Sequence, residues 1–427
     1  MLEMIVTLSR KFCRTGSEST IMARIVMKFG GTSVGSIERI KAVAEKVKAQ
    51  TERGDQVAVV VSAMSGTTNQ LVQWTQEAGA LHDAREYDVV VSSGEQVTVG
   101  LLAIALQNIG VEARSWLGWQ VALHTDNVHG GARIESIDAD NIINRFKQGQ
   151  VAVMAGFQGV AEDNRITTLG RGGSDTSAVA LAAALKADRC DIYTDVDGVY
   201  TTDPRIVPKA QKLDRITFEE MLEMASGGAK VLQTRSVAMA MRHGVALQVL
   251  SSFEDLSGTM VVNEEEIMEK NSVSGIAYSA DEAKITLAGL DDKPGVAATI
   301  FSNLADHNVN VDMIVQTAAS TKGKTDITFS VAGSELSRAK SVLDDLKTEI
   351  GLDNILTEEN VCKVSVVGMA MRSQPGIAKT MFTTLAEKGI NIEVISTSEI
   401  KISVLISRDY TELAVRSLHT AFGLDAS

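Results

Sequence analysis

Hydrophobic and polar positions follow two different periods along residues 23–262. Short apolar runs, rich in β-branched residues, predict buried strands at 24–29, 56–63, 151–157, 191–194 and 246–251. Between them, apolar residues recur with the helical period and predict helices at 37–49, 86–107, 176–186 and 231–242. Strands that alternate with helices predict an α/β layered domain with a mainly parallel sheet. We expect its chemistry to lie in the loops at the strand ends.

The pattern changes after residue 262. A Glu-rich stretch at 264–272 is typical of a connector, and an internal repeat follows it. Residues 295–314 align without gaps on residues 376–395, and a proline precedes each copy. Each copy predicts a strand, a Pro-Gly loop, a helix, two strands and a second helix. The sequence therefore predicts a small βαββαβ unit that is used twice.

Composition narrows the class of protein. The 427 residues include 41 Lys and Arg against 54 Asp and Glu, a formal net charge of −13, and 44% are hydrophobic. This balance is typical of an ordinary folded protein of two or three domains with a sizeable core. An acidic chain without a basic stripe disfavours nucleic acid as a partner. The three cysteines are widely spaced, so we expect neither disulfides nor structural zinc.

The apolar runs argue against a membrane protein. Runs such as 57–61 and 179–185 are much shorter than the roughly 20 residues that cross a bilayer, so we expect no membrane partner and a cytoplasmic location. Residues 1–21 are predicted to form a disordered extension, because their basic residues follow a short apolar run, the reverse of a signal peptide. A translation start at Met22 is an alternative.

The first candidate site lies at the end of the strand predicted at 24–29. There Lys28 and Phe29 precede the adjacent glycines Gly30 and Gly31, and a helix follows. Backbone N–H groups in such a loop can approach a phosphate closely. The segment fits neither a Walker A loop nor G-x-G-x-x-G. A glycine pair after a strand is more often a tight turn, but the lysine favours phosphate binding.

Two further segments combine glycines with polar residues. The segment 167–176, TTLGRGGSDT, leads directly into an Ala-rich helix. Asp175 or Ser174 can simply cap that helix, but capping leaves Arg171 unexplained, and its guanidinium suits a carboxylate or phosphate. The segment 193–205, YTDVDGVYTTDPR, follows a buried strand, the position of a nucleotide or metal loop in an open α/β sheet. A calcium loop is rejected because its bidentate Glu is missing.

Several motifs together resemble those of the aspartate kinase (aspartokinase) family, which has the amino-acid kinase fold. They are KFGGTS at 28–33, SSGEQ at 92–96, FQG at 157–159, TTLGRGGSDTSA at 167–178, YTDVDGVYTTDPR at 193–205 and GAKVL at 228–232. The repeat resembles the pair of ACT domains with which that family senses amino acids. The resemblance implies a three-layer αβα sandwich with a mainly parallel sheet, plus two ferredoxin-like βαββαβ (ACT) domains. The divisions it implies are a catalytic domain at 22–263, a connector at 264–272, and ACT domains at 273–352 and 353–427.

The resemblance also implies a reaction. The γ-phosphoryl group of MgATP would pass to the side-chain carboxylate of L-aspartate, giving 4-phospho-L-aspartate, the first step towards lysine, threonine and methionine. ATP and Mg²⁺ are the implied cofactors. An aspartate carboxylate is ionised at pH 7, so no general base is required. Catalysis would then consist of positioning and charge stabilisation.

The role of each site residue is implied by the motif that it matches. Lys28 would contact the transferred phosphoryl group, and Asp175 would organise the phosphate side of the site. Glu95 would bind the α-amino group of the substrate and Arg171 its α-carboxylate. The substrate residues implied are Thr68, Glu95, Arg171 and Ser174. The nucleotide residues implied are Lys28, Phe29, Gly30, Gly31, Thr194, Asp195, Tyr200, Arg205 and Lys230. No metal ligand is assigned. After GAKVL the chain has Gln233, Thr234 and Arg235 where some members have His-Pro.

The ACT resemblance implies inhibition by amino acids. The implied effector residues of the first copy are Asp292, Gly295, Val296, Asn310, Val311, Asp312 and Gln316. Those of the second copy are Gln374, Gly376, Ile377, Asn391 and Ile392. Lysine, threonine or both are expected as effectors. The family also implies a homodimer through the ACT domains. A start at Met268 would permit a separately translated regulatory chain, and hence a heterotetramer.

Two other functions stay open. A kinase of the same fold could act on another acid, such as glutamate, but SSGEQ with GRGGSD and two ACT modules favours aspartate. The chain could also be a catalytically silent amino-acid sensor. The intact residues Lys28, Arg171 and Asp175 argue against that function.

Overall fold

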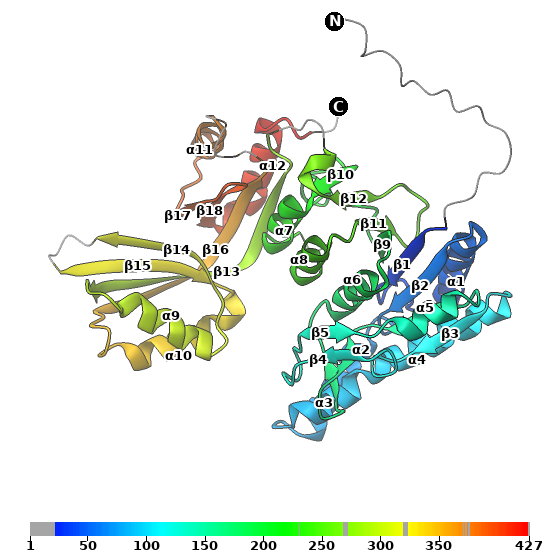
Figure 1. Ribbon diagram of the computed structural model, residues 1–427. Coiled ribbons are helices and arrows are strands. Elements are labelled where there is room, and N and C mark those ends of the chain that lie inside the picture. The colour runs from blue at the N-terminus through cyan, green and yellow to red at the C-terminus, as the bar shows by residue number, and fades with distance from the viewer. Residues whose placement is uncertain are drawn as a thin grey trace, which may run out of the picture.

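The computed structural model describes residues 22–229, 231–267, 272–318, 323–369, 371, 374 and 376–425. The extension predicted at 1–21, the nucleotide residue Lys230 and the alternative start at Met268 lie outside the described residues. Figure 1 shows an N-terminal part, coloured blue to green, beside a C-terminal part that is coloured yellow to red.

The N-terminal part is built on a sheet of eight described strands. Their spatial order is β10 (Arg215–Thr217), β12 (Thr259–Val262), β11 (Leu247–Ser251), β9 (Arg189–Thr194), β1 (Arg24–Phe29), β2 (Gln56–Val61), β6 (Val151–Ala155) and β3 (Ala113–Trp116). Neighbouring strands run parallel except β11 and β12. The central strands are apolar and buried at nearly every position, as expected when helices cover both faces.

Two layers of helices cover this sheet (Figure 1). On one face, α1 (Ile37–Glu52) and α4 (Ser93–Asn108) pack on alternate residues of β1, among them Phe29. The other face carries α5 (Asp140–Phe146), α6 (Gly173–Leu185), α7 (Phe218–Ser226) and α8 (Thr234–His243). The three-layer αβα sandwich with a mainly parallel sheet is therefore confirmed.

A smaller lobe lies at one end of the sandwich (Figure 1). Its helices are α2 (Thr67–Ala78) and α3 (Ala84–Val91). Its sheet has the order β5 (Ile134–Ile137), β4 (Leu123–Thr125), β7 (Gln158–Val160) and β8 (Ile166–Thr168). The sequence pattern predicted one helical region at 86–107. The structure has two helices instead, α3 and α4, which meet at Ser92.

The two helices together form an unusually apolar stretch. Ala84–Asn108 spans 25 residues and is long and apolar enough, by length and composition, to cross a membrane. Half of its most apolar window is buried inside the fold. A helix that is apolar on most sides is typical of a protein core, and α4 packs on the sheet through Val99, Leu102 and Leu106.

The C-terminal part is built on an antiparallel sheet of six described strands. Their order is β14 (Val311–Ala318), β15 (Lys324–Val331), β13 (Gly275–Asp291), β16 (Asn354–Val367), β18 (Lys401–Ser407) and β17 (Val394–Thr397). Helices α9 (Val296–Asp306) and α10 (Leu336–Leu346) pack on one half of the sheet. Helices α11 (Ile377–Glu387) and α12 (Thr411–Ala421) pack on the other half. Short 3₁₀ turns occur at Glu264–Glu266, Gly333–Glu335 and Arg408–Tyr410.

The two long strands β13 and β16 run through both halves of this sheet. The first part of β13, with Ile276, packs in the core of α11 and α12, whereas Ile285 and Leu287 further along pack in the core of α9 and α10. Within residues 376–425, α12 is the last regular element, so β13 provides the remaining outer strand of the second module. The predicted division between residues 352 and 353 assigns residues 275–279 to the first ACT domain, but these residues pack with the second module. The boundary itself stays a prediction.

Candidate active site

A cavity of about 340 Å³ opens at the carboxyl ends of neighbouring parallel strands. In open α/β sheets this is the usual place for a ligand. The residues that line it are Lys28, Ser62, Thr68, Glu95, Phe157, Gly170, Arg171, Gly172, Gly173, Ser174, Asp175 and Gln233. All six residues predicted to be catalytic or to contact substrate are among them, although they come from separate segments of the chain.

Lys28 and Asp175 form an ion pair in this cavity. Lys28 Nζ lies 2.5 Å from Asp175 Oδ1, and each side chain is about 11% exposed. Asp175 lies in the first turn of α6, where the helix dipole and free N–H groups favour an anion. A Cβ at Gly30 would lie 3.4 Å from Lys28 Nζ, so glycine leaves space beside the ammonium group. This end of the cavity is suited to a phosphate.

Glu95 is a buried carboxylate that uses only part of its hydrogen-bonding capacity. It is 3% exposed, and its Oε1 accepts a hydrogen bond from the Ala63 N–H at 2.9 Å. Its Oε2 is buried and has no hydrogen-bond partner within the described residues. Burial raises the pKa of Glu95 to about 7. A buried carboxylate oxygen without a partner is costly, so this position favours a ligand that brings a cation.

Arg171 presents the opposite charge at the same cavity. It lies in the loop between β8 and α6, is exposed, and forms no hydrogen bond or ion pair with any other residue that the structure describes. Arg235 supports this loop, because its guanidinium donates to the Leu169 carbonyl at 2.8 Å and to the Ala132 carbonyl at 2.7 Å. Within the described part of the chain, Glu95 thus offers one unpaired carboxylate oxygen and Arg171 an unpaired guanidinium, the two charges that an amino-acid zwitterion requires.

Besides the three glycines beside Arg171, namely Gly170, Gly172 and Gly173, three lining residues were not identified as site residues by sequence reasoning. They are Ser62, Phe157 and Gln233. Phe157 adopts a left-handed backbone with φ 69°, which is uncommon for a bulky residue and frequent at functional sites. Gln233 packs closely on Gly172, where a Cβ would approach its Cγ to 2.1 Å. The only sequence signals for them were the FQG motif and the departure at Gln233.

Metal ligands and reactive thiols are scarce around the site. No group of three or more His, Cys, Asp or Glu that could hold a metal ion occurs among the residues that the structure describes. Cys190 and Cys362 are free and buried, and burial raises the pKa of both thiols, so neither is activated.

Known proteins are similar to this chain in sequence and in fold. Residues 23–251 match the amino acid kinase family, and residues 285–346 and 364–422 match the ACT domain. The chain is 56% identical over 406 residues to the aspartate kinase of Pseudomonas putida, which covers 95% of this chain and 98% of that protein. The chain belongs to the aspartate kinase family.

Two solved structures of Escherichia coli aspartokinase III resemble the chain. The complex with aspartate and ADP in the R-state has a TM-score of 0.80 and 29% identity, and covers 93% of this chain and 99% of that one. The complex with lysine and aspartate in the T-state has a TM-score of 0.72 and 28% identity, with the same coverage. The catalytic and ACT domains of the family therefore correspond to the N-terminal and C-terminal parts described above.

Most residues predicted to bind nucleotide lie outside the cavity lining. Phe29 is buried in the core of the catalytic domain and stacks on Tyr193 with ring centroids 4.5 Å apart. Gly30 and Gly31 are partly buried, and the Gly30 N–H donates to the Tyr193 carbonyl at 3.4 Å. Thr194 is the last residue of β9 and Asp195 follows it, and β9 pairs with β1 so that Tyr193 lies beside Phe29. These residues are therefore next to the Lys28 end of the cavity.

Tyr200 and Arg205 lie where the catalytic domain meets the ACT part. Tyr200 donates from its hydroxyl to Asp197 at 2.9 Å and packs against the core of the second ACT module. Arg205 pairs with Asp203 at 2.7 Å and lines a second cavity of about 870 Å³, together with Tyr278 and Arg416. The predicted nucleotide loop thus also contacts the ACT part.

The predicted effector residues occupy equivalent places in the two ACT modules. Gly295 and Gly376 directly precede α9 and α11 with φ 100° and 121°, a backbone that favours glycine. The side chains of Val296 and Ile377 are buried, and Val311 and Ile392 are half-buried. The polar effector residues are exposed, namely Asp292, Asn310, Asp312, Gln316, Gln374 and Asn391.

Ion pairs connect the two ACT modules in a reciprocal way. Lys363 of β16 is 8% exposed and lies 2.8 Å both from Asp312 and from Glu282. In the repeat alignment Glu393 takes the place of Asp312, and it pairs with Lys284 of β13. Each module's acidic residue is therefore bound by a lysine on one of the two shared strands.

Proposed function

We propose that the chain transfers the γ-phosphoryl group of MgATP to the side-chain carboxylate of L-aspartate, giving 4-phospho-L-aspartate and ADP. One observation carries this proposal. A single cavity is lined by the Lys28–Asp175 ion pair, by Glu95 and by Arg171, and the Glu95 Oε2 and the Arg171 guanidinium have no partner among the residues that the structure describes. Aspartate and ADP occupy E. coli aspartokinase III, and that relative supports aspartate as the substrate and an adenine nucleotide as the second ligand here.

Two opposite charges provide recognition of the amino acid. Glu95 would accept from the α-ammonium group, and Arg171 would donate to the α-carboxylate in a fork. Thr68 and Ser174 line the same cavity and would contact the rest of the substrate. The buried Glu95 oxygen gains a partner only when a cation binds, so a zwitterion is favoured over a simple dicarboxylate.

Charge placement would carry the chemical step. The substrate carboxylate is ionised at neutral pH, so it needs no general base to attack the γ-phosphorus. Two anions must approach in line, and the Lys28 ammonium group would neutralise the transferred phosphoryl group. Asp175 holds that ammonium in place at 2.5 Å. Gly30, Gly31 and the N-terminus of α6 would supply N–H groups near the phosphates.

The nucleotide would extend from the Lys28 end of the cavity towards β9. Thr194, Asp195, Tyr200, Arg205 and Lys230 are the residues we propose for it. Mg²⁺ would arrive bound to the phosphates, as it commonly does in kinases, and would neutralise phosphate charge. Asp175, which pairs with Lys28, provides a carboxylate at that end of the cavity.

The ACT part would regulate the enzyme. We propose lysine, threonine or both as effectors that bind at the residues around Gly295 and Gly376, and a cytoplasmic homodimer that forms through the ACT domains. A heterotetramer with a separate regulatory chain remains the second arrangement. The lysine complex of E. coli aspartokinase III supports a regulatory role for an amino acid.

The test is ADP release with MgATP and L-aspartate, with L-glutamate as the control acid. We expect turnover with aspartate only, and less turnover when lysine and threonine are added. Lys28→Met should abolish it, whereas Lys48→Met, which removes a lysine of α1 that lies 3.9 Å from Glu52, should not. Equal turnover with glutamate would contradict the choice of substrate. Binding of lysine or threonine without turnover of either acid would establish a silent sensor.

A further inference from the structure

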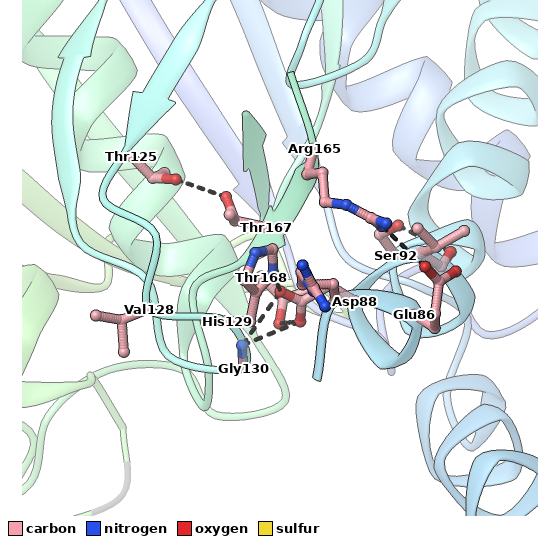
Figure 2. Close-up of polar contacts among 12 residues, drawn as sticks. Glu86, Asp88, Ser92, Thr125, Val128, His129, Gly130, Arg165, Thr167 and Thr168 are labelled. Carbon is pink, nitrogen blue, oxygen red and sulfur yellow. Dashed lines mark hydrogen bonds and ion pairs between the residues drawn. The ribbon is translucent and has the colours of Figure 1, made fainter. Parts of the chain in front are cut away.

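A second buried carboxylate lies close to the active-site cavity but outside its lining. Asp88 of α3 is fully buried. Figure 2 shows it at the centre of a polar cluster to which three segments contribute: α3, the loop 126–133 between β4 and β5, and the end of β8. No motif in the sequence pointed to this residue.

The Asp88 carboxylate receives hydrogen bonds from two segments of the chain. The His129 Nδ1 lies 2.7 Å from Oδ2, and the Gly130 N–H lies 3.1 Å and 3.2 Å from the two oxygens. The Thr168 hydroxyl donates to Oδ1 at 2.5 Å. The His129 tautomer that donates to a carboxylate is the one with its proton on Nδ1. Both oxygens are satisfied, as a buried charge requires.

Each segment that meets Asp88 continues to a residue proposed to bind the substrate. Helix α3 passes through Ser92 into the first turn of α4, which carries Glu95. Thr168 ends β8 and is three residues before Arg171. Asp88 therefore connects the helix that leads to Glu95 with the loop that carries Arg171.

The loop 126–133 also contacts the Arg171 loop directly. The Ala132 N–H donates to the Thr168 carbonyl at 2.9 Å. A Cβ at Gly170 would lie 3.2 Å from the Gly130 carbonyl oxygen, so the two loops approach closely there. A shift of His129 and Gly130 would consequently move the backbone that leads to Arg171.

A second contact joins the same two regions at the surface. Arg165, just before β8, pairs with Glu86 of α3 at 2.9 Å, and both side chains are substantially exposed (Figure 2). Exposed ion pairs contribute little because water and salt screen them. In the buried Asp88 cluster, by contrast, a polar group that lost its partner would be costly. We therefore expect this cluster to fix the position of α3 relative to β8.

We propose that Asp88 is a positioning residue for the amino-acid substrate. It holds Glu95 and Arg171 at the separation that the two charged groups of a zwitterion require. This inference rests on the proposed function. Asp88 contacts neither the Lys28–Asp175 pair nor the β9 loop, so its loss should change the recognition of L-aspartate and leave the recognition of MgATP intact.

The experiment measures KM for L-aspartate and for MgATP in Asp88→Asn and in a matched control, Glu86→Gln. Both substitutions remove one carboxylate charge from the same helix. We expect Asp88→Asn to raise KM for aspartate about tenfold or more, since small misplacements of binding groups are costly, with KM for MgATP within about twofold of the wild type. Glu86→Gln should leave both values within about twofold.

Two outcomes for Asp88→Asn would overturn the proposal. One is an unchanged KM for aspartate in a folded variant. The other is an equal rise in both KM values, which indicates general loss of structure. If Asp88→Asn does not fold, Thr168→Val removes one donor at nearly constant volume and should raise KM for aspartate about threefold, with KM for MgATP unchanged. An unchanged KM there would overturn the proposal as well.

Conservative substitution of the histidine provides an additional readout. His129→Asn keeps an N–H donor near the position of Nδ1 and should restore a KM close to that of the wild type, whereas His129→Leu should behave as Asp88→Asn does. Turnover of aspartate by the wild type in the same assay distinguishes a failure of the proposed function from a failure of the role of Asp88. Its absence would refute the proposed function, whereas an active wild type with unaffected variants would overturn only the role of Asp88.

Discussion

Replacing Glu95 with glutamine should weaken aspartate binding and alter how stability depends on pH. Burial raises the pKa of Glu95 from 4.5 to about 7 in the folded protein. Between these two pH values the folded protein keeps a proton that the unfolded chain has released. The free energy of unfolding therefore falls as the pH rises from 4.5 to 7, and the contribution is fully lost above pH 7. Glutamine does not titrate, so the variant lacks this loss.

The size of the effect follows from the two pKa values. Each pH unit between 4.5 and about 7 changes the free energy of unfolding by about 1.4 kcal/mol, a total of about 3 kcal/mol, most of which falls between pH 5 and pH 8. Urea-induced unfolding of the wild type and the variant at pH 5 and at pH 8 measures this change. The variant should gain about 2 to 3 kcal/mol relative to the wild type between pH 5 and pH 8. A difference that does not change with pH would refute the reasoning.

The same ionisation should appear in catalysis. Glu95 accepts from the substrate ammonium only when ionised, so kcat/KM for L-aspartate should rise about tenfold per pH unit below pH 7 and level off above it. In Glu95→Gln the slope should vanish, and kcat/KM at pH 8 should fall about 30-fold, as expected for the loss of a charged hydrogen bond of about 2 kcal/mol. A wild-type profile that is level from pH 6 to pH 8 would contradict the assignment of Glu95.

Three further substitutions test other parts of the structure. Arg171→Lys should raise KM for aspartate about tenfold, because lysine lacks the fork of donors that binds a carboxylate. It should change the free energy of unfolding by no more than about 0.5 kcal/mol, because Arg171 has no partner within the described residues. Steady-state kinetics and a thermal-shift measurement check the two results. Lys363→Met removes the lysine that pairs with the buried Glu282, and it should destabilise the ACT part by about 3 to 5 kcal/mol, measured by calorimetry. The double variant Lys363→Met/Glu282→Gln should recover part of this loss. Gly228 has φ 110°, and Gly228→Ala would place a Cβ 2.0 Å from the Tyr278 carbonyl oxygen. The substitution should lower the free energy of unfolding by about 2 to 4 kcal/mol and make the junction between the two parts more sensitive to limited proteolysis. Unchanged proteolysis would count against that contact.

Much of the fold was predictable because it depends on local patterns. The strand predicted at 24–29 is β1, residue for residue, since a buried parallel strand needs an unbroken apolar run. The helical and strand periods predicted an α/β layered domain with a mainly parallel sheet, the family resemblance implied its three αβα layers, and the repeat predicted two βαββαβ modules. The motifs around Lys28, Glu95 and Arg171 identified residues that meet in one cavity. Their roles, like the domain boundaries, stay predictions.

Other features depend on which segments meet in space, and no local pattern encodes that. The break between α3 and α4 at Ser92 was not predicted, because both helices are apolar enough to read as one. The sharing of β13 between the ACT modules was not predicted either, since strand pairing connects residues far apart in the sequence.

The burial of particular side chains was decided by the tertiary structure alone. Without the motif that it matches, Glu95 would be an ordinary helix residue, and no motif includes Asp88. Burial raises the pKa of Glu95 to about 7, and three donors from distant segments surround Asp88. The sequence determines which polar groups are present. The free energy of each group depends on its exposure to water and on its hydrogen-bond partners, and both are decided by the tertiary structure, because desolvation is a property of the folded chain.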